Sequence, residues 1–197
     1  MTARLLIVGP QGSGKGTQGV RIAEAFGIPA ISTGDIFRAN IQQGTDLGVK
    51  VKAIIDAGDL VSDDVTSELV RDRLAQDDAA QGFLLDGYPR NVAQVGHLDE
   101  FLAGRGEALD IVIELDVPRE ESIARIAQRA AEQGRDDDNE EAIARRLDIY
   151  ERETAPILDV FRERDIVVPV DGVGSLDEIT ERIVAALEAR GIERVAV

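Results

Sequence analysis

The sequence of 197 residues predicts an α/β fold, a three-layer sandwich in which helices cover both faces of a central five-stranded parallel sheet. Two observations support this fold. Short and largely apolar runs, such as 83–85 and 109–115, are typical of strands that are buried on both faces. Amphipathic segments at helical spacing separate these runs, and strands that alternate with helices usually pair in parallel.

Each element follows from a local pattern. We expect strands at about 3–8, 29–32, 82–86, 109–115 and 166–170. Helices are expected at about 20–26, after Asp35 as an N-cap, and at 49–57, 62–74, 91–103, 118–131, 140–164 and 176–189. Gly44 and Gly48 should interrupt the helices around them, and Pro156 should bend or break the long one.

The chain carries no internal repeat, low-complexity segment or Pro/Ser-rich linker, so we predict a single domain over 1–197. Residues 32–61 form a small helical insertion between strands in this prediction. Ligands of parallel α/β sheets bind at the carboxyl ends of the strands. The segments 9–17, 86–90 and 172–174 all fall at that edge.

Composition narrows the classes of partner. The 38 acidic residues outnumber the 22 basic ones, and a net charge of −16 argues against nucleic-acid binding, which needs a basic face. The absence of cysteine excludes disulfides and thiolate zinc sites. Because no apolar run reaches the roughly 18 residues of a membrane span and no signal-peptide core is present, we expect no membrane association and a cytoplasmic location.

The segment 9–17 has the features of a phosphate-binding loop. It lies between a predicted strand and a predicted helix, and its glycines let backbone N–H groups point at an anion. Lys15 supplies an ammonium group for the outer phosphates. Gly16 stands where such loops usually carry the Ser or Thr that holds magnesium, and the hydroxyl comes one residue later, at Thr17. The sequence therefore predicts a nucleotide polyphosphate site, but not that of a typical GTPase or motor ATPase.

A set of arginines falls near predicted strand ends. Their planar guanidinium groups suit phosphate oxygens, and a reaction that aligns two nucleotides needs such cations to stabilise the moving phosphoryl group. Any one of them alone would equally well be a surface residue, but together with the loop they favour an active site. These arginines are Arg38, Arg90, Arg125, Arg129, Arg135 and Arg146.

The sequence also offers acidic groups and a single histidine as candidate site residues. Asp86 closes a buried strand, where a carboxylate is costly without a cation, so we predict that it meets magnesium, through water. A cap for the following helix is the alternative for this residue. The acidic run 136–138 is more typical of a solvated loop, and His97 is expected to be a surface residue without a role.

Four motifs together resemble the adenylate kinase family, and the similarity spans nearly the whole chain. They are the segments 9–18, 32–38, 82–90 and 135–141. The resemblance implies a P-loop NTPase-like fold and reversible transfer of a phosphoryl group from MgATP to AMP, giving two ADP. It also divides the chain into a core (1–31, 62–127 and 139–197), a nucleoside-monophosphate-binding insertion (32–61) and a short lid (128–138).

The resemblance also implies roles for individual residues. The ATP phosphates and base would be held by Gly12, Ser13, Gly14, Lys15, Gly16, Thr17, Arg125, Arg129 and Gly174. AMP would be held by Thr33, Arg38, Asp59, Leu60, Val61, Gly87, Tyr88, Pro89, Arg90, Gln94, Arg135 and Arg146. Catalysis would depend on Lys15, Arg90, Arg129, Arg135 and Arg146.

The predicted lid is short. Only five residues separate Arg129 from Arg135, so the segment resembles the short-lid form, which has no room for a zinc site and implies a monomer. We expect 32–61 and 130–138 to move during closure. A UMP/CMP kinase remains the nearest alternative: Thr33 and Gln94 favour AMP, whereas Asn91 points weakly to a pyrimidine. A non-catalytic nucleotide sensor and a plain ATPase are further alternatives.

Overall fold

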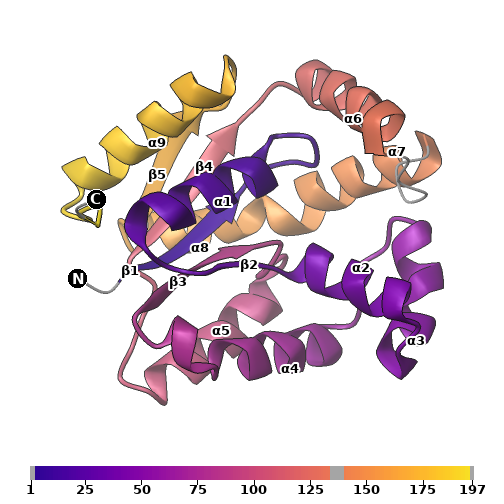
Figure 1. Ribbon diagram of the computed structural model, residues 1–197, viewed down its shortest axis with the longest axis horizontal. Helices are drawn as coiled ribbons and strands as arrows, with labels where there is room; N and C mark the ends of the chain where they lie inside the picture. Colours follow the sequence, from indigo (N-terminus) through magenta and orange to yellow (C-terminus); the bar gives the residue numbers. More distant parts are fainter. Residues whose placement is uncertain (1–2, 134–139, 196–197) are drawn as a thin grey trace.

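A parallel sheet forms the centre of the molecule in the computed structural model, which describes residues 3–133 and 140–195 (Figure 1). Its strand order is β2-β3-β1-β4-β5. The strands are β1 (Ala3–Val8), β2 (Ala30–Ser32), β3 (Gly82–Asp86), β4 (Ile111–Asp116) and β5 (Val167–Asp171). All pairs are parallel, which confirms the predicted α/β class and five-stranded sheet.

The position of β1 in the centre of the sheet explains why its residues are so apolar. Successive side chains of a strand point to opposite faces of the sheet. Leu5 and Ile7 of β1 therefore join one core cluster, whereas Leu6 and Val8 join another. All four are almost completely buried, as expected for a strand that is covered on both faces.

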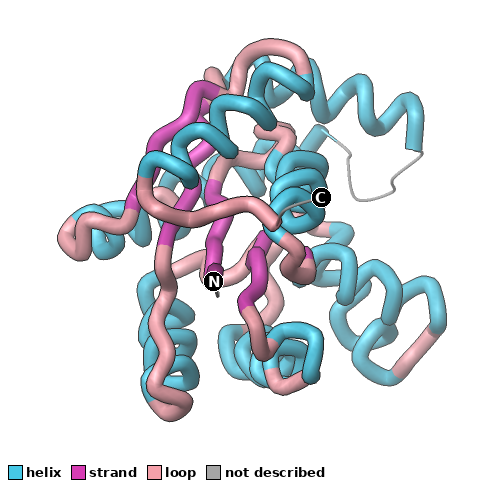
Figure 2. Tube along the Cα trace, turned by 60° about the vertical axis from the view of Figure 1, so that its left-hand side comes forward, coloured by secondary structure: helices cyan, strands magenta, loops and turns pink. Residues whose placement is uncertain are grey.

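Helices cover both faces, as Figures 1 and 2 show. Helices α1 (Lys15–Phe26) and α9 (Leu176–Ala189) contribute to the cluster of Leu5 and Ile7. Helices α4 (Asp63–Leu74), α5 (Val92–Ala103) and α8 (Pro156–Arg162) contribute to the cluster of Leu6 and Val8. Helices α6 (Arg119–Gln133) and α7 (Glu140–Ile149) lie between β4 and α8 in the chain.

A separate small core joins helices α2 (Thr33–Gln43) and α3 (Asp46–Asp56). Phe37 of α2, Val51 of α3 and Val61 form its buried centre, and Val65 and Leu69 of α4 pack against it. The two helices thus have their own apolar contacts. Figure 1 shows them to one side of the sheet.

The predicted beginnings of these two helices were wrong. Ser32, not Asp35, caps α2, because the Ser32 hydroxyl accepts a hydrogen bond from the Asp35 N–H. Helix α3 begins at Asp46 after the Thr45 cap and runs through Gly48, which was expected to interrupt it. A Cβ at Gly48 would lie 2.2 Å from the carbonyl oxygen of Asn40, so this glycine permits the close approach of two helices.

The predicted break at Pro156 is confirmed. Helix α7 ends at Ile149, a wide turn covers Tyr150–Thr154, and Pro156 begins α8. The first helical turn tolerates a proline because its missing N–H has no partner in the helix anyway. Helix α1 begins at Lys15, five residues before its predicted start and within the predicted loop 9–17. The other strands and helices differ from the predicted bounds by at most three residues, and the predicted acidic loop at 134–139 lies outside the described residues.

Within the described part of the chain, the helices are all too short or too polar to cross a membrane.

Candidate active site

A cleft of about 780 Å³ opens at the carboxyl ends of the strands. It is lined by the loop before α1, by residues of α2 and of the segment after α3, and by the turn after β3. Residues of α6 and α7 and the start of α9 complete the wall. The segments that the sequence placed at this edge therefore meet in one cavity.

The loop before α1 has the backbone of an anion cradle. Gly12 and Gly14 adopt positive φ angles of 80° and 87°, which favour glycine. A Cβ at Gly12 would lie 2.3 Å from the carbonyl oxygen of Ser122 in α6, so the loop passes close to that helix. The Ser13 hydroxyl oxygen is buried with no hydrogen-bond partner among the described residues, and Ser13 lines the cleft.

Lys15 and Asp86 form the electrostatic centre of the cleft. The pKa of Lys15 is lowered to about 8, mainly by burial; Asp86 opposes the shift, and the neighbouring Arg90, Arg129 and Arg146 contribute to it. Burial raises the pKa of the Asp86 carboxyl, an effect that the Lys15 ammonium and the Arg90 guanidinium oppose. The site thus holds more positive than negative charge, and an anionic ligand would relieve that imbalance.

The turn after β3 presents Arg90. The Arg90 Nε donates to the Gly87 carbonyl at 2.8 Å, and the Thr33 hydroxyl donates to the same oxygen at 2.9 Å. The Thr154 hydroxyl donates to the Arg90 carbonyl at 2.7 Å, which fixes the backbone of the turn. Burial lowers the pKa of Arg90, and Arg146 and Arg38 act in the same direction.

Arginines of α6 and α7 reach the cleft from the opposite side. Arg125 donates to the carbonyl oxygens of Ser13 at 3.2 Å and Gly172 at 3.0 Å, so it joins the loop before α1 to the loop after β5. Arg146 donates to the Ile55 carbonyl of α3 at 2.9 Å. Arg129 lines the same cleft.

Residues of the insertion and of α5 form the remaining wall. Arg38 pairs with Asp35 at 2.6 Å, and the Asp59 carboxylate pairs with Arg145 of α7. Gln94 is 1% exposed and lines the cleft. The predicted site residues that line this cavity are Gly12, Ser13, Gly14, Lys15, Gly16, Thr17, Thr33, Arg38, Asp59, Leu60, Val61, Asp86, Gly87, Pro89, Arg90, Gln94, Arg125, Arg129, Arg146 and Gly174.

Two predicted site residues stand apart. Tyr88 is a core residue whose hydroxyl lies 2.8 Å from the Ser67 hydroxyl, so only its backbone belongs to the turn. Arg135 lies outside the described residues. His97 is half-buried and its Nδ1 lies 2.9 Å from the same Ser67 hydroxyl, so it is less exposed than the surface residue that the sequence analysis expected.

Comparisons with known proteins agree with this geometry. A family model described as "Adenylate kinase" matches residues 7–166. A protein of Leifsonia xyli subsp. xyli named adenylate kinase is 60% identical over 188 residues, 95% of this chain and 94% of that protein. The adenylate kinases of Clavibacter michiganensis subsp. michiganensis and Kocuria rhizophila are each 57% identical and cover 96% and 94% of this chain. Those alignments span 94% and 98% of the two relatives.

The chain belongs to the adenylate kinase family. The resemblance that the four motifs carried is therefore confirmed, and with it the assignment to a family of phosphotransferases. Among the residues that the structure describes, no group of three or more His, Cys, Asp or Glu side chains could hold a metal ion by itself.

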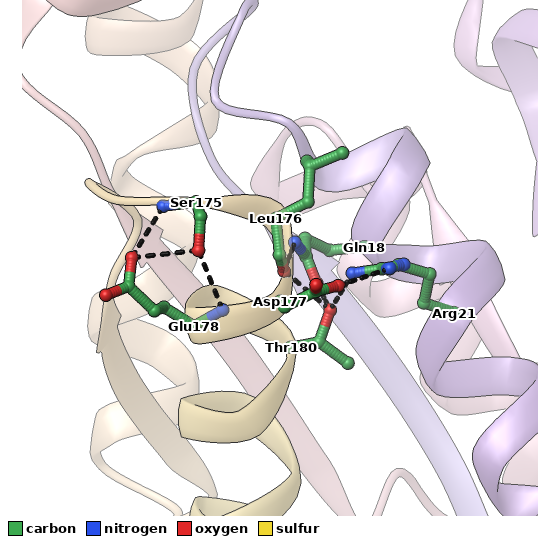
Figure 3. A network of polar contacts seen from close by, with 7 residues as sticks. All are labelled: Gln18, Arg21, Ser175, Leu176, Asp177, Glu178 and Thr180. Carbon is green, nitrogen blue, oxygen red and sulfur yellow. Dashed lines mark hydrogen bonds and ion pairs between the residues drawn. The ribbon is translucent and has the colours of Figure 1, made fainter.

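A polar network at the start of α9 was not predicted from the adenylate kinase motifs (Figure 3). The buried Gln18 of α1 donates to the Leu176 carbonyl at 3.0 Å and accepts from the Thr180 hydroxyl at 2.8 Å. Arg21 donates to Thr180 at 2.8 Å and pairs with Asp177 at 2.6 Å. The network fixes the helix that begins beside Gly174, on the wall of the cleft.

Two more contacts of cleft residues were not predicted from the sequence, for different reasons. Glu121 accepts from Arg125 at 2.7 Å, and its spacing of four residues within one helix was a readable signal. Thr154 lies 64 residues from its partner Arg90, and no local pattern marks such a pair.

Proposed function

We propose that this protein catalyses the reversible, magnesium-dependent reaction ATP + AMP = 2 ADP and so balances the adenine nucleotides. The observation that carries the proposal is the convergence of Lys15, Arg90, Arg129 and Arg146 on one cleft. The cleft joins a phosphate-binding loop to a second anion-binding turn, as transfer between two nucleotides requires.

ATP occupies the side of the cleft formed by the loop before α1. The backbone N–H groups and the N-terminus of α1 bind its phosphates together with Lys15. Thr17 supplies a hydroxyl to the same region of the cleft. The adenine lies between Arg125 and the backbone of Gly174, whose φ of 138° only glycine readily adopts.

AMP occupies the side formed by the insertion and the turn after β3. Arg38 and Arg90 bind its phosphate, and Thr33 orients the turn through its bond to the Gly87 carbonyl. Its base lies between Gln94 and the segment of Asp59, Leu60 and Val61. Pro89 and the backbone of Tyr88 complete this side.

The cations between the two subsites stabilise the charge on the moving phosphoryl group. Arg90 and Arg146 carry hydrogen bonds to backbone carbonyls, which orient their guanidinium groups before a substrate binds. We expect Arg135 to join them from the lid. Movements of 32–61 and 130–138 would exclude water, whose attack on ATP is the competing reaction.

Asp86 fits a role at magnesium. Its Oδ1 is buried and has no hydrogen-bond partner among the described residues, and its pKa is raised by the same burial. Gly16 leaves open the space beside it, since a Cβ at residue 16 would lie 3.5 Å from the Asp86 Oδ2. When bound with ATP, the ion neutralises part of the phosphate charge. Asp86 would hold the water molecules around it and orient them.

We expect the protein to act as a monomer that needs only small-molecule partners. ATP, AMP and ADP are these partners, and we expect the protein to act in the cytoplasm without nucleic acid or membrane. Zinc has no role in the proposal.

A panel of acceptors tests the function. The protein is incubated with MgATP and with AMP, CMP, UMP, GMP or dTMP, and diphosphate formation is measured by chromatography. We expect ADP only with AMP, in the ratio of two ADP per ATP consumed. CMP or UMP as the better acceptor would identify a pyrimidine kinase instead. ATP loss that does not depend on any monophosphate would refute the proposal, and so would binding without turnover.

A further inference from the structure

The amide of Gln94 is held in a single orientation by groups of the protein. Its Oε1 accepts a hydrogen bond from the backbone N–H of Arg90 at 2.8 Å, and its Nε2 donates to Oδ1 of Asp63 at 2.7 Å. A backbone N–H can only donate, and an ionised carboxylate can only accept. The two partners therefore decide which end of the amide is the oxygen. A rotation of the amide by 180° would place its NH2 group against the N–H of Arg90 and its oxygen against the carboxylate of Asp63.

Asp63 controls this arrangement without lining the cleft. It is the first residue of α4, and the same Oδ1 accepts from Nδ2 of Asn91 at 2.9 Å. That contact turns Oδ1 of Asn91 toward the N–H of Gln94, which it caps at 2.9 Å. Asp63 thus holds the N-terminus of α5 and the Gln94 side chain together. Asp63 is not among the residues that line the cleft.

The remaining hydrogen-bonding capacity of Gln94 has a fixed polarity. An amide carries two N–H groups and two acceptor lone pairs, and one of each is already used. One N–H and one lone pair are left for a base in the cleft. A 6-aminopurine offers a ring nitrogen acceptor beside an amino donor, whereas a 6-oxopurine offers a ring N–H donor beside an oxygen acceptor. The two edges therefore need opposite orientations of the amide.

We propose that Asp63 is a specificity-determining positioning residue, which locks Gln94 in the orientation that accepts a 6-aminopurine monophosphate and rejects a 6-oxopurine monophosphate. This inference rests on the proposed binding of AMP beside Gln94. The base cannot rotate to match the amide, because Arg90 binds the phosphate of the nucleotide and the segment 59–61 packs against the face of the base. Discrimination then arises from the polar group that a wrong base leaves unpaired.

The test compares AMP with IMP as acceptor at saturating MgATP in wild type, Asp63→Ala, Asp63→Asn and Asp64→Ala. We expect Asp63→Ala to lower the ratio of kcat/KM for AMP over IMP by about tenfold, the effect of one hydrogen bond. The change should lie in KM for the monophosphate, with KM for ATP unchanged. Asp63→Asn should keep most of the preference, because its amide oxygen can still accept from Gln94. Asp64 is exposed in the same helical turn and serves as the control for charge, so its variant should match wild type.

Each outcome has a defined meaning. A ratio that stays unchanged in Asp63→Ala, or that falls equally in Asp64→Ala, overturns the inference while the proposed function stands. Should Asp63→Ala fail to fold, Asp63→Ser keeps a polar group at the start of α4 but is too short to reach Gln94. It must then show the same fall in the AMP/IMP ratio, and an unchanged ratio in this variant is equally fatal. A wild type that phosphorylates neither monophosphate would instead remove the proposed function, and this inference with it.

Discussion

Nucleotide binding should draw a proton into the cleft in alkaline solution, because of Lys15. Burial and three neighbouring arginines hold its pKa at about 8 in the free protein. The phosphates of ATP would return the pKa at least to its ordinary value of 10.5. At pH 9 the free protein carries this proton in about a tenth of the molecules and the complex in nearly all. We therefore expect an uptake of about 0.9 proton at pH 9, about 0.5 at pH 8 and about 0.1 at pH 7.

The same linkage fixes the sign of the affinity change. Only the protonated form of Lys15 binds the phosphates well, so the apparent Kd for ATP should rise about tenfold between pH 7 and pH 9. Nucleotide phosphates, with a second pKa near 6, are already ionised over this range. For the free protein the sign is opposite: a folded-state pKa below the unfolded one means that the charged lysine opposes folding. That opposition fades as the pH rises from about 8 toward 10.5.

Calorimetric titration with ATP in buffers of different ionisation enthalpy measures the proton uptake directly. Lys15→Arg is the matched control, because arginine keeps a cation beside Asp86 but does not titrate below pH 12. This variant should bind ATP with no uptake at pH 9. The raised pKa of Asp86 could also produce an uptake, but one that decreases as the pH rises. An uptake that decreases from pH 7 to pH 9, or that survives in Lys15→Arg, would refute the assignment.

Three further substitutions test other parts of the site. Arg90→Ala should lower kcat/KM by two to four orders of magnitude without lowering the Tm, because the fold itself disfavours this buried cation; an equally large loss of Tm would mark a structural residue. Gly12→Ala should destabilise the protein by about 2–4 kcal/mol in urea unfolding, since its Cβ would strike the Ser122 carbonyl at a positive φ; an unchanged midpoint contradicts the close approach. Thr180→Val removes a hydroxyl from the buried Gln18 and should cost about 1–2 kcal/mol, with KM for ATP rising more than KM for AMP; equal effects on both would show that α9 does not support the ATP side alone.

The fold and the anion cradle could be predicted because their determinants are local. A strand buried on both faces needs an apolar run, and a loop that wraps a phosphate needs glycine at defined positions. Both patterns are visible within about ten residues of sequence. Gly12 and Gly14 do adopt the positive φ angles that such a loop requires.

The errors arose where one residue type serves two purposes. Gly48 was expected to interrupt the helices, but it lies inside α3, where that helix approaches the Asn40 carbonyl of α2. Asp35 was expected to cap a helix with its carboxylate, but that carboxylate pairs with Arg38 and Ser32 is the cap. Sequence spacing alone does not distinguish a glycine that stops a helix from one that admits a neighbour.

Contacts between distant segments could not be predicted from the sequence, for a different reason. The partners of Thr154 and Asp63 lie 64 and about 30 residues away, and only the folded sheet brings them together. The expected roles of Arg90 and Gln94 come from the resemblance to the family. The groups that hold them in place could not be predicted in this way, because nothing in the family motifs refers to them.

The acidity of the protein and the cationic cleft follow from where the arginines find their partners. Away from the cleft, arginines such as Arg73 and Arg164 pair with carboxylates at 2.7 Å, so each adds no net charge to the surface around it. In the cleft, Arg90 is oriented by the backbone carbonyl of Gly87, which accepts a hydrogen bond but carries no net charge. Burial lowers the pKa of Lys15 and of Arg90, and repulsion by neighbouring guanidinium groups acts in the same direction. Phosphates that enter the cleft would relieve this repulsion. A carboxylate partner in place of this carbonyl would orient Arg90 equally well, but it would compete with the substrate. A chain with a net charge of −16 can therefore still present a cation to an anionic ligand where, as at Arg90, the guanidinium group has a backbone carbonyl as its partner.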